Sequence, residues 1–264
     1  MQPLEAGRFF AVASPAFSPA GRLAFIASNC AACQQRLRIM GGLHVSILSE
    51  GLSAAWLSSR KLVVSVGHGE DTDVWVVSPN GHGHELEWLT RAAAKLGIET
   101  EQDLVVSPDR RMLLFSGEGK GEHHGNYLVD LPRRRLFPLA GEAADGPAFS
   151  PDGRRIAYQQ QVSLGGDWDL CLADLTVRAA SHAHCFRSAG TNDREPAFLP
   201  NGRELVFSSD RAARRNGVSS LYLLDLRTGS VSRLTPSGYD ATSPKVADDG
   251  HSVVFVRRAL VRLR

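Results

Sequence analysis

The feature that most constrains this chain is an internal repeat. Six segments each carry a short apolar strand, a turn such as Ser-Pro-Asp-Gly, and a second apolar strand. One anchor residue in each copy aligns them: Phe17, Trp56, Val106, Phe149, Phe198 and Val246. Successive anchors lie 39, 50, 43, 49 and 48 residues apart. A repeat of this length is typical of β-propeller blades.

The turn residues predict a β-hairpin in every copy. In the fourth copy, Pro151 presets φ, Asp152 can bond the nearby backbone, and Gly153 can adopt a left-handed conformation. Asp152 is therefore interpreted as a turn former rather than a catalytic acid. The spacing from the anchor to the matching apolar residue on the next strand is one residue shorter in the first two copies than in the last four. We expect a tighter turn there.

Apolar segments after each hairpin predict two further strands. Four antiparallel strands per repeat predict an all-β, six-bladed β-propeller that forms a single domain over residues 1–264. The last repeat has three strands, with residues 260–264 as its third. Residues 7–13 are therefore expected to supply its outer strand and close the ring. The repeats start near residues 14, 53, 103, 146, 195 and 243; third strands are predicted at 73–77, 126–131, 169–175 and 220–226, and fourth strands end at 87–90, 136–139 and 232–235.

Composition excludes several classes of protein. With 43% hydrophobic residues and a net charge of +2, the chain is neither disordered nor strongly charged. The sequence has no run of eighteen apolar residues, so we expect no membrane-spanning helix. The N-terminus lacks the basic segment of a signal peptide. We expect a cytoplasmic protein if the chain is complete, or an extracytoplasmic one if a leader has been removed.

Two segments resemble a known repeat family. "REPAFLPNGRELVFSSDR" (194–211) followed by "LYLLDLRTGSVSRLT" (221–235) is similar to the TolB-type, WD40-like β-propeller repeat of bacteria. The likeness is to the repeat family rather than to TolB itself, whose N-terminal α/β domain has no counterpart here. It implies a six-bladed propeller that binds a protein or peptide, commonly in the periplasm, and it transfers no catalytic residue. We expect no nucleic-acid partner, and a monomer when the chain is alone.

Strand alternation separates two faces of the predicted propeller. With the strands of a repeat named A to D, the short A–B turns and the C–D turns emerge on one face, and the longer B–C and D–A loops on the other. Binding residues are expected in the varied loops. Two interpretations stay open for the acids of these loops, which should ring the mouth of the central channel: capping of loop backbones, or a polar funnel that accepts a basic or metal-bearing group. For the arginines the alternatives are a solvated loop, a nucleic-acid site, or docking of an acidic partner surface. The candidate partner-binding residues are Asp145, Asp193, Arg194, Arg211, Arg214, Arg215, Tyr239 and Asp240.

A metal site is a further hypothesis for the varied face. Sulfur and imidazole ligands suit zinc or copper, although they lie here on separate loops. No other cofactor is expected. The alternative to a binding protein is a lyase or hydrolase, possibly metal-assisted, with His123 or His124 as its base. The candidate ligands are Cys30, Cys33, His68, His123 and His124.

Cys171 and Cys185 are interpreted structurally. They fall on the predicted third and fourth strands of the fourth repeat, and a turn centred near Arg178 places them opposite each other. A turn one residue tighter would instead bring His184 opposite Cys171. A disulfide here would argue for an oxidising compartment.

Overall fold

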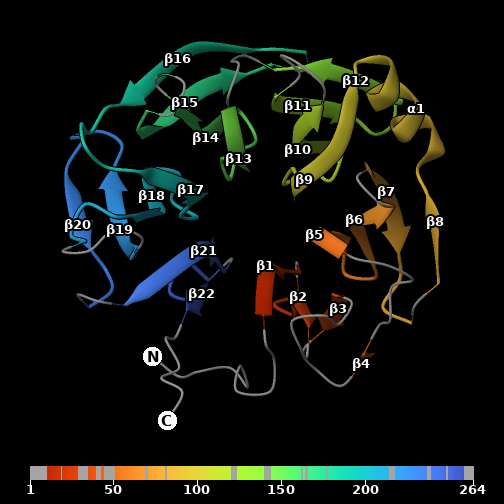
Figure 1. The fold of residues 1–264 in the computed structure, drawn as a ribbon, viewed down its shortest axis with the longest axis horizontal. Helices are drawn as coiled ribbons and strands as arrows, with labels where there is room; N and C mark the ends of the chain where they lie inside the picture. The colour runs from red at the N-terminus through yellow and green to blue at the C-terminus, as the bar shows by residue number, and fades with distance from the viewer. Residues whose placement is uncertain are drawn as a thin grey trace. The chain divides into compact units, whose positions relative to one another are not determined.

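In the part of the chain that it describes, a computed structural model shows six antiparallel sheets that follow one another in sequence (Figure 1). The chain divides into two compact units, Met1–Glu142 with Val177–Ala179, and Ala143–Thr176 with Ala180–Arg264. The described residues are 11–18, 20–28, 35–39, 43–44, 51–68, 71–80, 82–119, 124–139, 144–161, 163, 166–176, 178–213, 218–236, 239–247 and 249–258.

The first unit holds three four-stranded sheets, in each of which the strands pair in chain order. A helix, α1, joins the second sheet to the third. The sheets comprise β1 (Ala11–Phe17), β2 (Leu23–Ser28), β3 (Arg36–Ile39) and β4 (Leu43–His44); β5 (Gly51–Ser58), β6 (Lys61–His68), β7 (Asp71–Val77) and β8 (Gly83–Glu85); and β9 (Ile98–Val106), β10 (Met112–Gly119), β11 (Gly125–Asp130) and β12 (Arg135–Pro138).

The described residues of the second unit form two four-stranded sheets and a two-stranded sheet. They comprise β13 (Ala144–Phe149), β14 (Arg155–Gln161), β15 (Trp168–Leu175) and β16 (Ala180–Phe186); β17 (Asp193–Phe198), β18 (Glu204–Ser209), β19 (Ser220–Asp225) and β20 (Val231–Arg233); and β21 (Asp240–Val246) with β22 (Val253–Arg258).

Four-stranded antiparallel sheets in succession are the blades of a β-propeller, so the predicted all-β architecture is confirmed. The described residues form five complete blades and not the six that were predicted. Residues 260–264, the predicted third strand of the last repeat, lie outside the described residues. The prediction of a single domain stays a prediction.

The prediction that residues 7–13 form an outer strand of the last blade is wrong for residues 11–13. Ala11, Val12 and Ala13 pair with Ser28, Ala27 and Ile26 of β2, so they belong to the first strand of the first blade. The reason is an irregularity between Ala13 and Ala16, which lets β1 continue beyond the repeat motif instead of ending there. Residues 7–10 lie outside the described residues.

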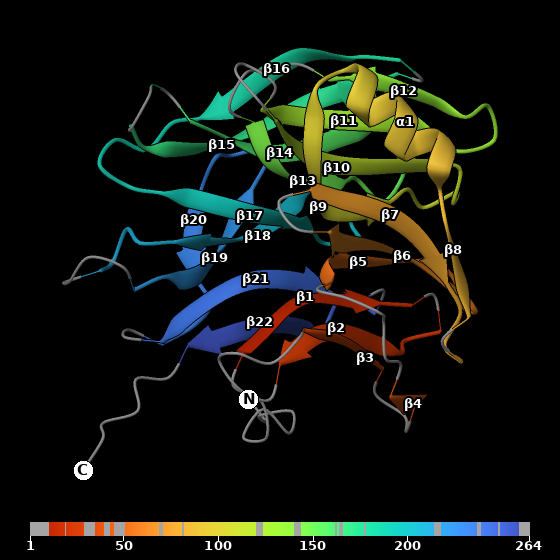
Figure 2. The ribbon, with the colours of Figure 1, turned by 45° about the vertical axis from the view of Figure 1, so that its right-hand side comes forward.

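A second correction concerns residues 87–90, which were predicted to end a fourth strand. They begin α1 (Glu87–Lys95), and the fourth strand of that blade is the shorter β8. The helix buries Leu89 and Ala93, four residues apart on one face, and packs against β7, β9 and β12 (Figure 2). An ion pair from Arg91 to Glu87, with a nitrogen–oxygen distance of 2.5 Å, spans one helical turn. The four-residue spacing of the buried Leu89 and Ala93 therefore favours a helix where residues 87–90 alone were interpreted as the end of a strand.

The hairpin turns follow the predicted chemistry. In the fourth blade, Asp152 Oδ1 accepts hydrogen bonds from Ser150 Oγ at 2.6 Å and Arg154 N at 3.0 Å, while Gly153 has φ +69°. The Ser150 hydrogen bond lowers the pKa of Asp152 below its usual value. Anchors Phe17 and Trp56 pair with Leu23 and Leu62, six residues on, whereas the later anchors pair seven residues on, as Phe149 does with Ile156. The tighter turns of the first two copies are confirmed.

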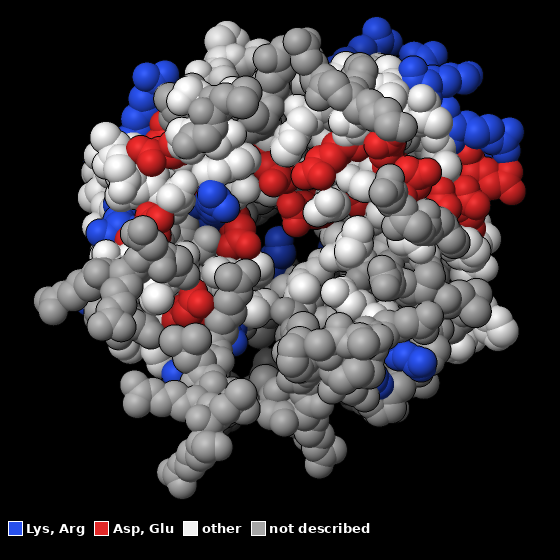
Figure 3. Space-filling model, in the orientation of Figure 1, with Lys and Arg blue, Asp and Glu red and all other residues white. Residues whose placement is uncertain are grey.

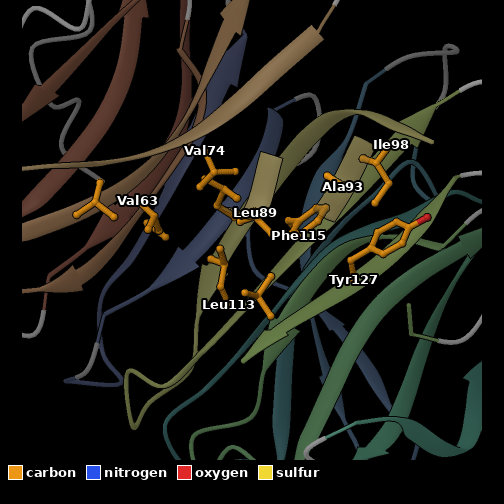
Figure 4. Close-up of a cluster of buried hydrophobic side chains, with 12 residues drawn as sticks. Val63, Val74, Leu89, Ala93, Ile98, Leu113, Phe115 and Tyr127 are labelled. Atoms are coloured by element: carbon orange, nitrogen blue, oxygen red, sulfur yellow. The ribbon is translucent and has the colours of Figure 1, made fainter. Parts of the chain in front are cut away.

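Each unit has an apolar core between its sheets. In the first unit, Val63 and Val74 of the second sheet meet Leu113, Phe115 and other side chains of the third, with α1 closing one side (Figure 4). Phe115 stacks on Tyr127 with ring centroids 5.4 Å apart. Burial of such side chains is the main stabilising term of the fold.

A β-bulge recurs in the first strand of the blades, three residues before the anchor. Five of these positions have positive φ, which costs side-chain-bearing residues free energy. The pairing register shifts around each of them. The bulge lets one residue per strand turn its polar groups toward the neighbouring blade. The five residues are Ser14 (φ 49°), Asp103 (50°), Gly146 (57°), Glu195 (55°) and Ser243 (52°).

Candidate partner-binding site

In the second unit, the starts of β15 and β17 meet the end of β18 at one end of the sheets. The connection between β16 and β17, residues 187–192, is held there by three carboxylates. Asp169 Oδ1 accepts from Ser188 N at 3.1 Å, Asp167 Oδ2 from Gly190 N at 2.7 Å, and Asp210 Oδ1 from Asn192 N at 2.8 Å. B–C and D–A loops of this unit therefore lie at the same end, as strand alternation predicts. Side-chain carboxylates therefore hold the backbone amides of Ser188, Gly190 and Asn192.

Trp168 and Arg194 lie beside this loop. The Arg194 guanidinium carbon stands 5.0 Å from the centroid of the Trp168 ring, a cation–π arrangement. Arg194 is exposed and Trp168 is half-buried. Arg194 Nη2 also donates to Asn192 Oδ1 at 3.5 Å. We call Trp168, residues 187–192 and Arg194 the loop-end surface.

Asp193 and Arg211, two of the candidate residues, face each other inside the unit. Arg211 Nη2 donates to Asp193 Oδ2 at 2.5 Å, and Ser209 Oγ donates to Asp193 Oδ1 at 2.6 Å. The Arg211 guanidinium lies 5.2 Å from the ring centroids of both Phe207 and Tyr222. Burial raises the pKa of Asp193, although Ser209 and Arg211 act in the opposite direction. These buried contacts connect the end of β18 to Asp193, the first residue of β17.

The other described candidates also make local contacts. Asp145 Oδ1 accepts from Gly146 N at 2.9 Å, and Asp240 Oδ1 accepts from Ser219 N at 3.1 Å. The Tyr239 ring lies under the Arg257 guanidinium, 4.0 Å from its centroid. The acids thus cap backbone groups, which favours the first of the two interpretations left open by the sequence. Arg214 and Arg215 lie outside the described residues.

The candidate metal ligands are mostly beyond the described part of the chain. Cys30, Cys33 and His123 fall outside it, and His68 is placed only as the last residue of β6. His124 is described and half-buried. Within the described residues, no group of three or more His, Cys, Asp or Glu side chains is arranged to hold a metal ion.

One serine, histidine and aspartate cluster on β15 and β16 does not have the geometry of a catalytic triad. Ser181 Oγ and Asp174 Oδ2 both approach the same atom, His182 Nδ1, at 3.4 Å. A triad requires the nucleophile and the acid on opposite ring nitrogens. The side chains of His182 and Asp174 are also 83% and 61% exposed, so nothing shields the cluster from water.

Acidic side chains gather on the first unit. Figure 3 shows them as a band over the region of β9 and α1. Glu101 of β9 is buried and hydrogen-bonded to Thr72, whose Oγ1 donates to Glu101 Oε2 at 2.6 Å. Burial, with the nearby charges of Asp73 and Asp71, raises the pKa of Glu101 to about 7, against the opposing effect of the Thr72 hydrogen bond.

Cys171 and Cys185 form the disulfide for which the sequence left two registers open. They are directly opposite on β15 and β16, while His184 pairs with Leu172. The bond ties the outer strand of the fourth blade to its sheet, one residue before the strand ends at the loop-end surface.

Comparison with known proteins decides the family. A family model described as "TolB beta propeller domain" matches residues 127–262, just over half of the 264-residue chain. This chain belongs to the TolB beta propeller domain family. The TolB-type resemblance of the repeats is thereby confirmed.

Solved structures share the fold of this TolB-family propeller. A putative TolB from Agrobacterium tumefaciens matches 95% of this chain and 91% of its own, at 16% identity and a TM-score of 0.67. TolB from Acinetobacter baumannii matches 94% of this chain and 58% of its own, at 18% identity and a TM-score of 0.63. A puromycin-hydrolyzing peptidase from Mycobacterium tuberculosis matches 97% of this chain and 45% of its own, at 13% identity and a TM-score of 0.62.

A curated relative is similar over a shorter stretch. The uncharacterized peptidase YuxL of Bacillus subtilis (strain 168) is 27% identical over 109 residues, which are 41% of this chain and 16% of that protein. The TolB-family propeller thus spans only a small part of this relative. In the part of this chain that the structure describes, no helix is long and apolar enough to cross a membrane.

Sequence reasoning missed Trp168 and the three acids that hold residues 187–192. The signal available for Trp168 and two of the acids was the run Gly166-Asp167-Trp168-Asp169, in which two acids flank an aromatic residue where β15 begins. The partners of these side chains lie about twenty or more positions away in the chain, so local patterns do not reveal them.

Proposed function

We propose that this chain is a non-catalytic propeller that binds a protein or peptide through the loop-end surface. The observation that carries the proposal is the exposed Arg194 stacked on Trp168 beside a loop fixed by three carboxylates. Tryptophan and arginine are the residues most often found to dominate binding energy at protein interfaces. A surface that is already ordered loses little conformational entropy on binding. An acidic or aromatic side chain of the partner fits this pair best.

The Asp193–Arg211 pair supports the loop-end surface from beneath rather than touching a partner. Arg211 is half-buried and its charge is balanced by Asp193. Of the candidate residues that the structure describes, Arg194 is the one whose guanidinium is exposed beside an aromatic platform. Arg214 and Arg215 stay candidates on the basis of sequence alone.

We also propose that β21 and β22 begin a sixth blade. Their hairpin has the seven-residue pairing offset of the third, fourth and fifth blades, since Val246 pairs with Val253. Gly250 has φ +68° in the turn, and Asp249 accepts from the amides of His251 and Ser252. Residues 260–264 remain the proposed third strand.

An extracytoplasmic location fits this proposal. The Cys171–Cys185 disulfide is supported by direct cross-strand pairing, and such bonds persist in oxidising compartments such as the bacterial periplasm.

The experiment that tests the proposed function is affinity capture from an extract of the source organism. Wild-type protein is compared with Arg194→Glu and with the matched control Arg203→Glu, an exposed arginine beside the A–B turn of the same blade. The proposal expects a specific protein to be captured by the wild type and the control and lost from Arg194→Glu. Equal capture by all three would contradict it.

A hydrolase is the second candidate, favoured by the names of the two peptidases among the similar proteins. Both extend well beyond the part that this chain matches. His124 would be the candidate base of such a hydrolase. Among the described residues, no hydrogen-bond partner lies near the buried Nε2 of His124.

A further inference from the structure

A second exposed arginine stacks on an aromatic ring at the same end of the second unit as the loop-end surface. The Arg257 guanidinium carbon stands 4.0 Å from the centroid of the Tyr239 ring. Tyr239 directly precedes β21, and Arg257 is the last but one residue of β22. β21 begins and β22 ends at the end of the sheets where β15 and β17 begin. We call Tyr239 and Arg257 the second pair.

Strand pairing and ring packing build the second pair. Arg257 lies opposite Ala241, so the end of β22 returns beside the residues that start β21. The Phe255 ring meets the Tyr239 ring edge-on, with centroids 6.4 Å apart, and Tyr239 N donates to Pro236 O at 3.3 Å. These contacts hold the ring against the guanidinium, where the negative face of an aromatic ring attracts a cation.

The second pair belongs to the sheet next to that of Arg194. Arg194 is the second residue of β17, and β17 and β21 lie side by side (Figure 1). A hydrogen bond also joins the two strands, because Glu195 Oε2 accepts from Ser243 N at 2.7 Å. One segment of a partner that crosses from β17 to β21 can therefore contact both arginines.

The charge that these pairs expose is positive. Arg194 and Arg257 are exposed, and among the described residues neither forms an ion pair with a carboxylate. The acids of this end are buried or half-buried, and each already accepts a hydrogen bond from a backbone amide or from Arg211; they are Asp167, Asp169, Asp193, Asp210 and Asp240. A partner therefore meets the two guanidinium groups first.

Guanidinium chemistry defines what these groups recognise. A guanidinium presents its donors in a planar fork that matches a carboxylate, and such charge-assisted hydrogen bonds are stronger than neutral ones. Two of them on neighbouring sheets favour a segment with two acidic side chains. Once the first carboxylate is bound, the second binds within the same complex and gains from the high effective concentration.

We propose that Arg194 on Trp168 and Arg257 on Tyr239 together bind an acidic peptide segment of the partner protein. Each guanidinium binds one carboxylate, and the two aromatic rings position the arginines. The inference rests on the proposed function, because it names the chemistry of the partner at the loop-end surface and extends the contact to the second pair.

The test is the fluorescence anisotropy of a short labelled peptide in which glutamate alternates with glycine, titrated with the whole protein at constant ionic strength. We expect saturable binding that weakens at least about fivefold in Arg194→Ala and in Arg257→Ala. The matched control is Arg203→Ala, which changes an exposed arginine at the opposite end of the same unit. Circular dichroism and thermal unfolding establish that each variant is folded.

A pair of tyrosine variants tests the positioning role of the ring. Tyr239→Phe keeps the ring and should bind the peptide as the wild type does. Tyr239→Ala removes the ring and should weaken binding as Arg257→Ala does. Equal affinity of Tyr239→Ala and the wild type would contradict the role of the ring.

A matched peptide with glutamine in place of glutamate separates charge from shape. Binding of the glutamine peptide as tight as that of the glutamate peptide, or no saturable binding of the latter, would overturn the acidic partner. Unchanged affinity in Arg257→Ala would overturn the second pair. In the affinity capture, a partner lost from Arg194→Glu but kept by Arg257→Glu would contradict this inference alone, whereas equal capture by the wild type and Arg194→Glu would contradict the proposed function.

Discussion

At the scale of single residues, the clearest departure from ordinary chemistry is Glu101. Its carboxyl group is buried beside Thr72 and close to the charges of Asp71 and Asp73, and its pKa is raised from 4.5 to about 7. The folded protein therefore holds a proton that the unfolded chain releases between those two pH values. By linkage, the free energy of unfolding falls as pH rises through this window. At pH 8 the protein carries the cost of a buried carboxylate.

Replacing this carboxyl by a neutral amide removes that pH dependence. We expect Glu101→Gln to exceed the wild type in free energy of unfolding at pH 8, by up to about 3 kcal/mol, and to show little gain at pH 5. Urea unfolding at the two pH values measures the difference, with exposed Glu118→Gln on β10 as the control. A stability difference that is the same at both pH values would contradict the assigned cause.

At the scale of elements, the bulge residues join neighbouring blades within each unit. In the first unit, Ser14 Oγ accepts from Ala54 N at 3.1 Å, and Ser53 Oγ accepts from Leu104 N at 2.8 Å. In the second, Glu195 Oε2 accepts from Ser243 N at 2.7 Å. The side chain at the bulge of one blade thus binds an amide at the bulge of the next. The positive φ of Ser14 and of Glu195 is offset by the hydrogen bonds that their side chains accept.

Gly146 shows how this arrangement adapts when the bulge residue has no side chain. Its φ is +57°, and a Cβ there would lie 3.1 Å from Gln159 Oε1. That same oxygen accepts from Glu195 N at 2.7 Å. The side chain of Gln159, on β14, therefore accepts the hydrogen bond from Glu195 N that Gly146, on β13, has no side chain to accept.

Removing one such acceptor leaves a backbone amide without its partner. We expect Glu195→Ala to lower the free energy of unfolding by about 1–3 kcal/mol, and Glu195→Gln, which keeps one amide oxygen, to recover part of the loss. The control is Glu204→Ala, whose carboxylate accepts from Asn201 in the adjacent turn. Urea unfolding provides the measurement. An effect no larger than that of Glu204→Ala would contradict the role of the bulge.

The disulfide acts on one element, the outer strand β16. Its exposed middle residues give it little apolar contact with the rest of the unit. Closing a loop with a sequence separation of 14 should stabilise the fold by about 3 kcal/mol. We expect Cys171→Ser with Cys185→Ser, or reduction of the wild type, to lower the melting temperature. Reductant should leave the double variant unchanged, and an equal response in both proteins would disprove this role.

At the scale of the whole molecule, the sequence was most informative where the chemistry is local. The turns around Asp152 and the anchor positions depend on neighbouring residues, so the blades and their pairing offsets were predictable. Residues 87–90 were misread because a four-residue apolar pattern does not distinguish a strand from the first turn of α1. The irregularity in β1 near Ser14 was likewise invisible before the pairing was known.

The candidate sites depend on contacts between distant residues, and there the sequence was less informative. The acids at Asp193 and Asp240 were found, but whether they face inward or outward depends on partners such as Arg211 and Ser219. Proximity of this kind follows only from packing.

We propose that this TolB-family propeller binds its partner through the loop-end surface. The dissociation constant of the captured partner is measured for the wild type, Trp168→Ala, Arg194→Glu and Arg203→Glu. We expect binding at least about tenfold weaker for the changes at Trp168 and Arg194, and an unchanged constant for Arg203→Glu. Unchanged binding in the first two variants, with the protein still folded, would contradict it.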